Sequence, residues 1–208
     1  MKKIITALFA TMMTTSVFAN GMIGIKYGTG ELEATKKQYT AGSNTYTAQT
    51  KAKNHEYGAI FVELFVPDID GLSVGIDYIP YTATVSVDGN SSDSYAELSD
   101  HTTVYGLYSK ELGGFSPFIK VGYSVADIEA FANYSTTTIN SSDDSMKGIT
   151  YALGVQAEVM DGVVGRLEAS YTEYDDLSVT TTSNGSSSVK KTAEADLTTF
   201  SLSIAKSF

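Results

Sequence analysis

Apolar and polar residues alternate with a period of two along several stretches of the chain, and this alternation predicts β-strands that each have one apolar face. The clearest stretch is residues 148–159, in which Ile149, Tyr151 and Leu153 alternate with small or polar residues. The other stretches span residues 22–32, 57–66, 72–81, 102–112, 117–125, 165–171 and 200–208. The pattern therefore predicts eight strands.

Long and short connections alternate between these stretches. The long ones are polar, rich in Ser, Thr, Asn and Asp, and span residues 33–55, 88–101, 133–146 and 175–193. The short ones, residues 67–71, 113–116 and 161–164, contain Gly together with other turn-forming residues. In an up-and-down meander, alternate connections lie at opposite ends of the strands, so all the long connections are expected at one end.

That asymmetry predicts the fold class: an all-β, eight-stranded, antiparallel, up-and-down transmembrane β-barrel with short periplasmic turns and long extracellular loops. The aromatic residues fit two interfacial girdles. One is expected near the long loops, from Tyr57, Tyr78, Tyr81, Tyr105, Tyr151 and Tyr171, and the other at the short turns, from Phe115 and Phe208. A secreted lipocalin-like binding barrel is the alternative fold, with its apolar face turned inward around a ligand.

Residues 1–19 have the features of a secretory signal peptide. Lys2 and Lys3 precede an apolar segment that ends in the sequence VFA, a cleavage site of the small-residue type. The segment is too short to span a bilayer, so we divide the chain into a signal peptide, residues 1–19, and a barrel domain, residues 20–208. The net charge of −10 without a basic patch argues against a nucleic-acid partner, and the absence of Cys excludes disulfides and thiolate metal sites.

The final stretch, FSLSIAKSF, adds a resemblance to a known family. Together with the signal peptide and the alternating segments, it resembles the small eight-stranded outer-membrane barrels of Gram-negative bacteria, the group that contains the transmembrane domain of outer membrane protein A. The resemblance implies an outer-membrane location, contact with lipid and lipopolysaccharide, a monomeric barrel, and recognition by the barrel assembly machinery. Phe200, Leu202, Ile204 and Phe208 match the family's C-terminal assembly signal, and Lys206 departs from it.

The polar faces of the predicted strands place charged side chains inside the barrel. In residues 102–112, for example, we assign Tyr105 and Leu107 to the lipid face and Lys110 to the lumen. An eight-stranded barrel has a lumen just wide enough for side chains, so the buried charges should pair with one another. The lumen charge network is expected to consist of Lys26, Glu63, Asp77, Lys110, Lys120, Glu158, Arg166 and Glu168.

Two functions are open for such a barrel. The first is a structural and surface-interaction role, in which the charge network closes the lumen and four long extracellular loops meet an external surface ligand. The alternative is a narrow or gated pore, in which an exchange of partners within the charge-lined lumen opens a path for ions.

Enzymatic chemistry has little support from the sequence. His55 and His101 lie at loop bases, and Asp100 precedes His101, so a rim-located lipid-modifying enzyme is a third alternative. No nucleophile context is readable, and we therefore expect a protein that is not an enzyme, without catalytic residues or a cofactor. The loop that begins at Asp88 opens like a calcium loop but lacks its turn glycine and its bidentate Glu, so no metal site is expected.

Overall fold

The computed structural model of the protein describes residues 20–41, 43–80, 83–86, 95–131, 137–141, 145–183 and 189–208. The predicted signal peptide, Tyr81 and the start of the loop at Asp88 lie outside the described residues. The strands in the described residues are β1 (Gly21–Lys36), β2 (Tyr39–Ala41), β3 (Asn44–Tyr46), β4 (Gln49–Phe65), β5 (Leu72–Ile79), β6 (Ala83–Ser86), β7 (Tyr95–Ser109), β8 (Ser116–Phe131), β9 (Thr137–Ser141), β10 (Ser145–Met160), β11 (Val163–Tyr174), β12 (Leu177–Ser183) and β13 (Val189–Ser207). Within the described residues, no helical segment has the length and the apolar character needed to traverse a bilayer.

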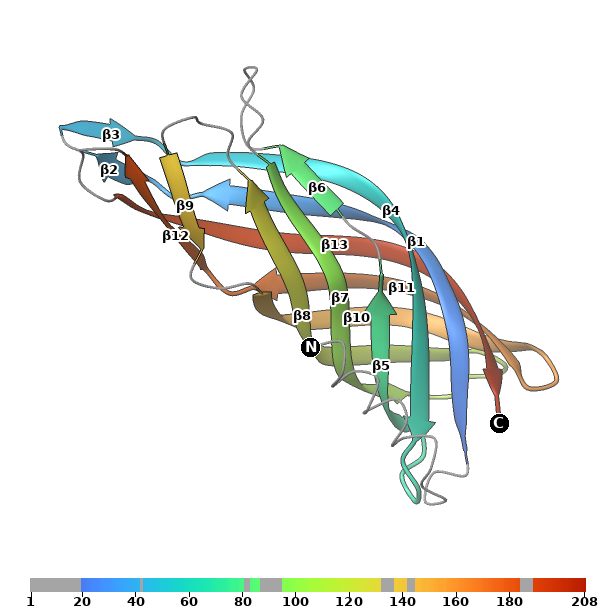
Figure 1. Ribbon diagram of the computed structural model, residues 1–208. Helices are drawn as coiled ribbons and strands as arrows, with labels where there is room; N and C mark the ends of the chain where they lie inside the picture. The colour runs from blue at the N-terminus through green and yellow to red at the C-terminus, as the bar shows by residue number, and fades with distance from the viewer. Residues whose placement is uncertain are drawn as a thin grey trace.

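Eight of these strands form one closed antiparallel barrel. They are neighbours in the order β1, β4, β5, β7, β8, β10, β11 and β13, and β13 pairs with β1 to close the ring (Figure 1). Each strand of the ring lies next to the ring strand that follows it in the sequence, which is the up-and-down topology. The predicted eight-stranded fold is confirmed.

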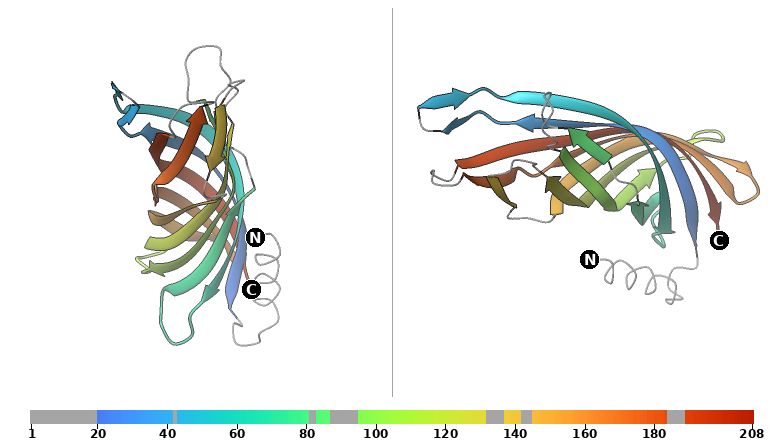
Figure 2. Two further views of the ribbon diagram at one scale, coloured as in Figure 1. Left: turned by 60° about the vertical axis from the view of Figure 1, so that its left-hand side comes forward. Right: turned by 45° about the horizontal axis from the view of Figure 1, so that its top comes forward.

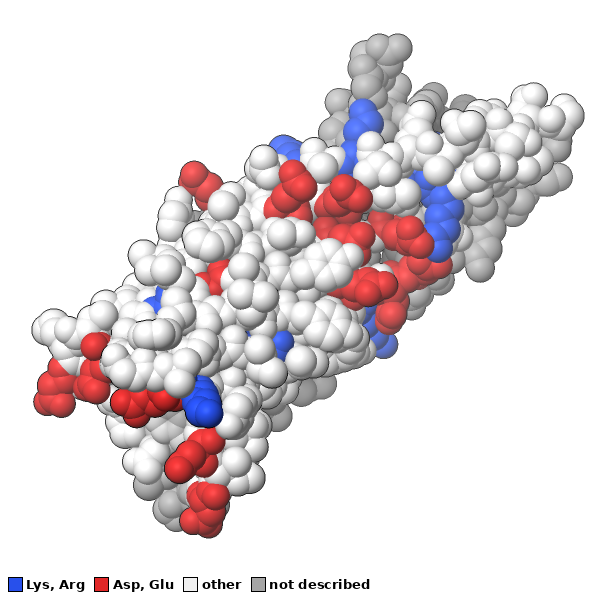
Figure 3. Space-filling view, turned by 180° about the vertical axis from the view of Figure 1, so that it is seen from behind, with Lys and Arg blue, Asp and Glu red and all other residues white. Residues whose placement is uncertain are grey.

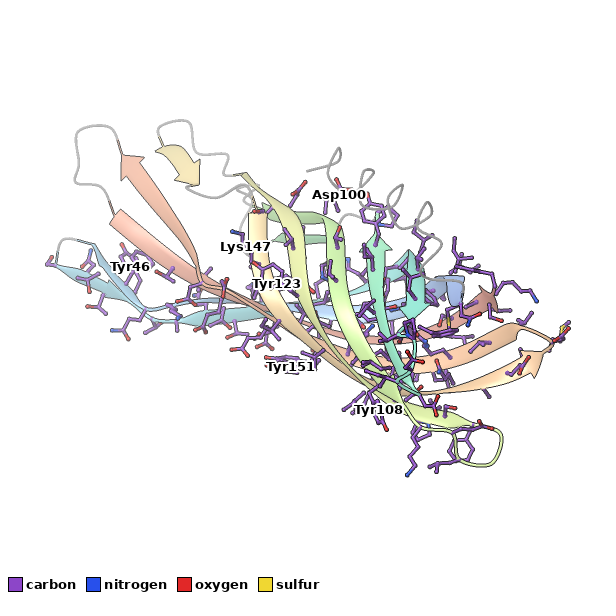
Figure 4. The ribbon with its side chains drawn as sticks, turned by 90° about the horizontal axis from the view of Figure 1, so that it is seen from below. Tyr46, Asp100, Tyr108, Tyr123, Lys147 and Tyr151 are labelled. Atoms are coloured by element: carbon purple, nitrogen blue, oxygen red, sulfur yellow. The ribbon has the colours of Figure 1, made fainter. Side chains whose placement is uncertain are left out.

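Large apolar side chains cover the outside of the barrel. Ile25, Ile119, Leu153 and Leu202 come from four different strands, and each is between 60% and 65% exposed. An apolar surface of this kind is unfavourable in water and favourable in lipid, so it is the membrane-facing surface of a transmembrane barrel. The lipocalin-like alternative, which requires the apolar face to point inward, is wrong. Figure 4 shows Tyr108, Tyr123 and Tyr151 on the same outer surface.

The strands continue beyond the apolar band at the end with the long connections. β1 and β4 stay paired as far as Lys36 and Gln49, whereas the sequence pattern predicts a loop over residues 33–55. The other long connections likewise contain β9, β12 and the first residues of β7, β10 and β13. The loop boundaries were wrong because a ladder of backbone hydrogen bonds does not require apolar side chains, and Thr-rich segments favour strands. β2 and β3 form the tip of the β1–β4 hairpin, which projects from the barrel (Figure 2).

The opposite end of the barrel has tight turns. Gly71, Gly113, Gly114 and Gly162 all have positive φ angles, between 64° and 100°, as does Asp68 at 63°. These residues lie in the short connections, where the sequence predicts turns that need the left-handed region. The short turns therefore lie at the end of the barrel remote from the β2–β3 tip (Figure 1).

Between β4 and β6, the described part of the barrel wall has no ladder of backbone hydrogen bonds. β5 pairs with β4 only from Ile60 to Phe65, and Pro80 follows β5 directly. Proline cannot donate a ladder hydrogen bond, which accounts for the end of β5. The next strand, β6, pairs with β7, and among the described residues no ladder joins Gln49–Ala59 to β6. Backbone hydrogen bonds thus close the wall in the half near the short turns, whereas in the other half no ladder joins β4 to β6 in the part of the chain that the structure describes.

Candidate functional site in the barrel lumen

A cluster of four buried charges lies inside the barrel. The Lys26 ammonium donates hydrogen bonds to Asp77 and, over 2.9 Å, to Glu168. The Lys120 ammonium donates to the same Glu168 oxygen over 2.7 Å and lies 3.9 Å from Asp77. All four side chains are less than one tenth exposed. The residues come from β1, β5, β8 and β11, so the cluster connects strands that are not neighbours and crosses the lumen.

A second cluster lies nearer the short turns and is centred on one ion pair. Arg166 contacts Glu63 with two nitrogens, over 3.0 Å and 3.2 Å, in the bidentate geometry that strengthens such pairs. The hydroxyls of Ser73 and Tyr105 donate to the two Glu63 oxygens over 2.9 Å and 3.0 Å. Arg166 Nη2 and Nε also donate to the Gln156 side-chain oxygen, over 2.7 Å and 3.1 Å.

The guanidinium of Arg166 is also enclosed by aromatic rings. Its central carbon lies 5.3 Å from the centre of the Phe61 ring and 4.9 Å from that of Phe118, both within the range of cation–π attraction. The Lys120 ammonium lies 4.7 Å from the centre of the Tyr105 ring. Three cations and three carboxylates therefore balance in the two clusters, and their hydrogen bonds and ring contacts cross this half of the lumen.

Two further layers follow towards the β2–β3 tip. The first is a chain of buried hydroxyls that runs from Thr103 through Ser124 and Thr150 to Thr172, on four successive barrel strands. The second, which we call the apolar layer, consists mainly of the buried side chains Leu32, Leu98, Ala126, Met146 and Tyr174, and the buried His101 ring lies beside Tyr174. The order along β11, from Arg166 through Glu168 and Thr172 to Tyr174, gives the order of the layers along the barrel.

The sequence assigned the two faces of β7 the wrong way round. Tyr105 and Leu107 are buried in the lumen, and Tyr108 is exposed on the outer surface (Figure 4). Both faces of this stretch contain aromatic or aliphatic residues, so a period of two identifies the strand but does not determine which face points into the lumen. For the same reason Tyr105 is absent from the aromatic girdle, and Tyr57 is also buried inside. Sequence reasoning therefore missed Tyr105 as a partner of Glu63.

Two residues predicted for the charge network lie outside it. Lys110 is exposed and follows the last residue of β7, and the reversal of the faces of that strand directs it away from the lumen. Glu158 is also exposed, beside a register shift at the end of β10, and it accepts a hydrogen bond from the Gly162 backbone over 2.7 Å. The other six predicted charges, Lys26, Glu63, Asp77, Lys120, Arg166 and Glu168, are all buried and paired.

No protein-family model and no curated protein sequence matches the chain. Among solved structures, the outer membrane protein OprG from Pseudomonas aeruginosa is similar with a TM-score of 0.66 at 13% identity, over 90% of this chain and 96% of that chain. Neisserial surface protein A is similar with a TM-score of 0.52 at 13% identity, over 89% and 97%. The chain has the fold of the small outer-membrane β-barrels. The outer membrane protease OmpT from Escherichia coli is also similar, with a TM-score of 0.57 at 12% identity over 94% and 99% of the two chains.

The residues considered for a rim enzyme do not form a catalytic group in the structure, and neither does the acidic residue Asp176 at another loop base. His101 is buried on β7, with its ring 6.0 Å from the Tyr174 ring, while the Asp100 carboxylate accepts a hydrogen bond from Tyr78. Asp176 is exposed and pairs with Lys37 over 2.8 Å. Among the described residues, no group of three His, Asp or Glu side chains has the arrangement of a metal site.

The residues of the predicted assembly signal all lie on the outer surface of β13 and at its end. Phe200, Leu202, Ile204 and Phe208 are each at least half exposed. Lys206 lies in the same outer register, and its ammonium donates to the Asp161 carbonyl in the turn between β10 and β11, over 2.9 Å. Recognition of these residues by the assembly machinery stays a prediction.

Proposed function

We propose that the protein is a bacterial outer-membrane barrel whose lumen is closed to ions and whose activity resides in its extracellular surface. The observation behind this proposal is the paired charge network, because three cations and three carboxylates cross-link the lumen from opposite walls. Opening an ion path would separate buried partners, and an uncompensated buried charge costs about 3–5 kcal/mol. In this proposal the protein is a monomer in contact with lipid and lipopolysaccharide.

The extended hairpins support the second half of the proposal. β1 and β4 remain paired past the apolar band and present a ribbon with a defined tip, which a loop of the same length would not do. Such a ribbon is a preorganised surface, and preorganisation lowers the entropic cost of binding. The external ligand would meet this surface rather than the lumen.

Two measurements test this proposal. The purified protein in a planar bilayer should show no steady conductance, since the paired network leaves no free path. Replacement of residues 37–48 by Asn-Gly should keep the barrel intact, because Lys36 and Gln49 are register partners that a two-residue turn can join. Cells that display this shortened variant should adhere to surfaces no better than cells without the protein. A steady conductance, or full adhesion by the shortened variant, would contradict the proposal.

A second candidate function is the passage of small apolar molecules between the extracellular side and the lipid. Two observations favour it: the part of β4 that has no ladder to β6 among the described residues, and the apolar layer of the lumen at the same half of the barrel. A wall that is not joined by hydrogen bonds separates at lower cost than one that is, and apolar solutes meet no unpaired charge in that layer. The charged layer would block their continued passage along the barrel axis.

The two methionines Met146 and Met160 provide a matched test of this second function. Met146 is buried in the apolar layer, while Met160 is 66% exposed at the end of β10. Vesicles that contain the protein should take up a small apolar dye faster than empty vesicles. Met146→Gln should slow that uptake by about fivefold, because an amide among apolar groups costs about 1–3 kcal/mol, and Met160→Gln should not change it. Equal uptake by empty and protein-containing vesicles would contradict the candidate function.

A further inference from the structure

The β1–β4 hairpin beyond the apolar band has two faces of opposite charge. Its register continues without a bulge from the pair Tyr27 and Gly58 to the pair Lys36 and Gln49, so the alternation of the barrel wall extends along the hairpin. The face that continues the outer surface of the barrel, which we call the outer face, has the acidic residues Glu31, Glu33 and Glu56. The face that continues the lumen side, which we call the inner face, has the basic residues Lys36, Lys51 and Lys53.

The acidity of the outer face extends to neighbouring strands. Asp196 of β13 is the register partner of Glu33 on one side and of Glu173 on the other, so three carboxylates form a row across three strands. Figure 3 shows acidic side chains gathered on the rear surface of the molecule. Because lipopolysaccharide is anionic, the outer face is not a surface that attracts its phosphates.

The lysines of the inner face have no acidic partners among the residues that the structure describes. Among the described residues, no carboxylate forms an ion pair with Lys36, Lys51 or Lys53. Lys37, which follows β1, differs: hydrogen bonds to Asp176 and Glu194 raise the pKa of its ammonium. Lys51 is the register partner of Ala34, so it lies diagonally opposite Lys36, and Lys53 follows on the same face at about 7 Å along the strand. The inner face is thus a cluster of positive charge, without a described acidic partner, on an acidic protein.

A pair of aromatic rings lies at the tip beside these lysines. Tyr39 and Tyr46 are register partners in β2 and β3, and their rings stack with centres 4.7 Å apart and planes 8° apart. The Lys36 ammonium lies 5.3 Å from the centre of the Tyr39 ring, which places the rings next to the lysine cluster. Tyr46 is 43% exposed, and Figure 4 shows it at the far end of the hairpin. An exposed ring held rigid by a stacked partner is a platform for the apolar face of a sugar ring.

We propose that the inner face of the hairpin binds a linear anionic polysaccharide presented by another surface. This inference rests on the proposed extracellular role and names the class of its ligand. Separate lysine ammonium groups on one face match the spaced sulfate or carboxylate groups of such a chain, and the Tyr46 ring supplies a stacking contact between them. We do not assign the cell's own lipopolysaccharide as the ligand, because it would meet the outer face of the hairpin, which is acidic, and not the lysines of the inner face.

The position of the lysines along β1 agrees with a ligand from outside the cell. Lys36 lies about 30 Å further along the strand than Tyr27, at about 3.3 Å per residue, and Tyr27 is exposed in the apolar band. Even with a strand tilt of about 45°, this distance exceeds the depth of the lipid headgroups. A nucleic-acid duplex would need a larger basic interface than three lysines, because such interfaces bury about 600 Å² or more of protein surface.

Binding to heparin, a sulfated linear polysaccharide, tests the inference. The whole mature protein in detergent micelles is passed over immobilised heparin at several salt concentrations, with neutral dextran and a single-stranded oligonucleotide as comparison ligands. The wild type should bind heparin and release it as salt is added, and it should not bind dextran. Lys51→Gln with Lys53→Gln should weaken heparin binding by about tenfold, since exposed ion pairs each contribute a factor of about two to five.

The matched control removes two exposed lysines elsewhere. Lys110 and Lys147 are both exposed outside the hairpin, so the double replacement by Gln gives the same change of net charge. This control should bind heparin as the wild type does, and Tyr46→Ser should weaken binding while leaving its salt dependence unchanged. Equal loss in both double variants, or stronger binding to the oligonucleotide than to heparin, would overturn the inference. If cells adhere through the protein although the protein does not bind heparin, the polysaccharide inference is wrong and the proposed surface role stands. If the protein binds heparin but cells that display it do not adhere, the proposed surface role is wrong and the polysaccharide inference stands.

Discussion

Arg166→Met is expected to destabilise the folded barrel by about 3–5 kcal/mol, the usual cost of removing one partner of a buried ion pair. The cause is the carboxylate left behind: Glu63 is 1% exposed, and without Arg166 it would keep only the hydroxyl donors of Ser73 and Tyr105. The free energy of unfolding can be measured by urea titration of the protein folded into phospholipid vesicles.

A double-mutant cycle separates the ion pair from the packing of the methylene groups. Glu63→Gln with Arg166→Met should lose less stability than the sum of the two single changes, because the double variant has no unpaired charge at this site. Lys110→Met is the control, since this lysine is exposed and outside the network, and it should change the stability by no more than about 0.5 kcal/mol. A loss below about 1 kcal/mol for Arg166→Met would mean that water solvates Glu63 and that the lumen is open.

Gly154→Ala should lower the stability by about 1–3 kcal/mol or more, because no room exists for even one methyl group. A Cβ at Gly154 would overlap the Leu167 carbonyl oxygen and the ring of Phe118, which in turn packs against Arg166. Gly106 is the matched control: it lies on β7 with an ordinary φ, and nothing lies within 4 Å of a Cβ built there. Gly106→Ala should be neutral or slightly stabilising, since Ala restricts the unfolded chain.

Thermal or urea unfolding of both glycine variants in the same vesicles makes the comparison. If Gly154→Ala and Gly106→Ala have equal stability, the wall and the Phe118 ring must move apart easily at this level, and the packing described for the charged layer would be incorrect. A selective loss at Gly154 would instead show that the lumen is filled to the point where the wall cannot adjust.

The proposed function gives different roles to the two ends of the barrel. Near the short turns, every described ionisable side chain in the lumen clusters has an opposite charge within reach, which favours rigidity over conduction. Beyond the apolar band, the inner-face lysines Lys36, Lys51 and Lys53 have no such partner among the described residues, which favours binding. The difference arises from solvation. Charges removed from water must pair to offset their desolvation, whereas charges exposed to water are stable without a partner and remain available to a ligand.

The alternation of residues by itself determined most of the barrel. The stretches around Ile25, Ile119, Leu153 and Leu202 have the lipid-facing side that their pattern predicts, because lipid on one side and a polar lumen on the other act on every second residue. The tight turns were equally readable, since Gly71, Gly113 and Gly162 adopt backbone angles that other residues avoid. These features depend only on the local sequence and on whether a strand face meets lipid or the polar lumen.

The tertiary structure alone decided which faces and charges meet. β7 has apolar residues on both faces, so only its packing in the closed ring brings Tyr105 to Glu63 and directs Lys110 outward. Lys26 contacts Asp77 and Glu168 across the lumen, and such pairs depend on the stagger of strands that are remote in sequence. The extension of the β1–β4 hairpin beyond the apolar band was also visible only in the structure. Backbone hydrogen bonds extend a ladder whatever the side chains are, so the hydrophobic pattern does not indicate where the ladder ends.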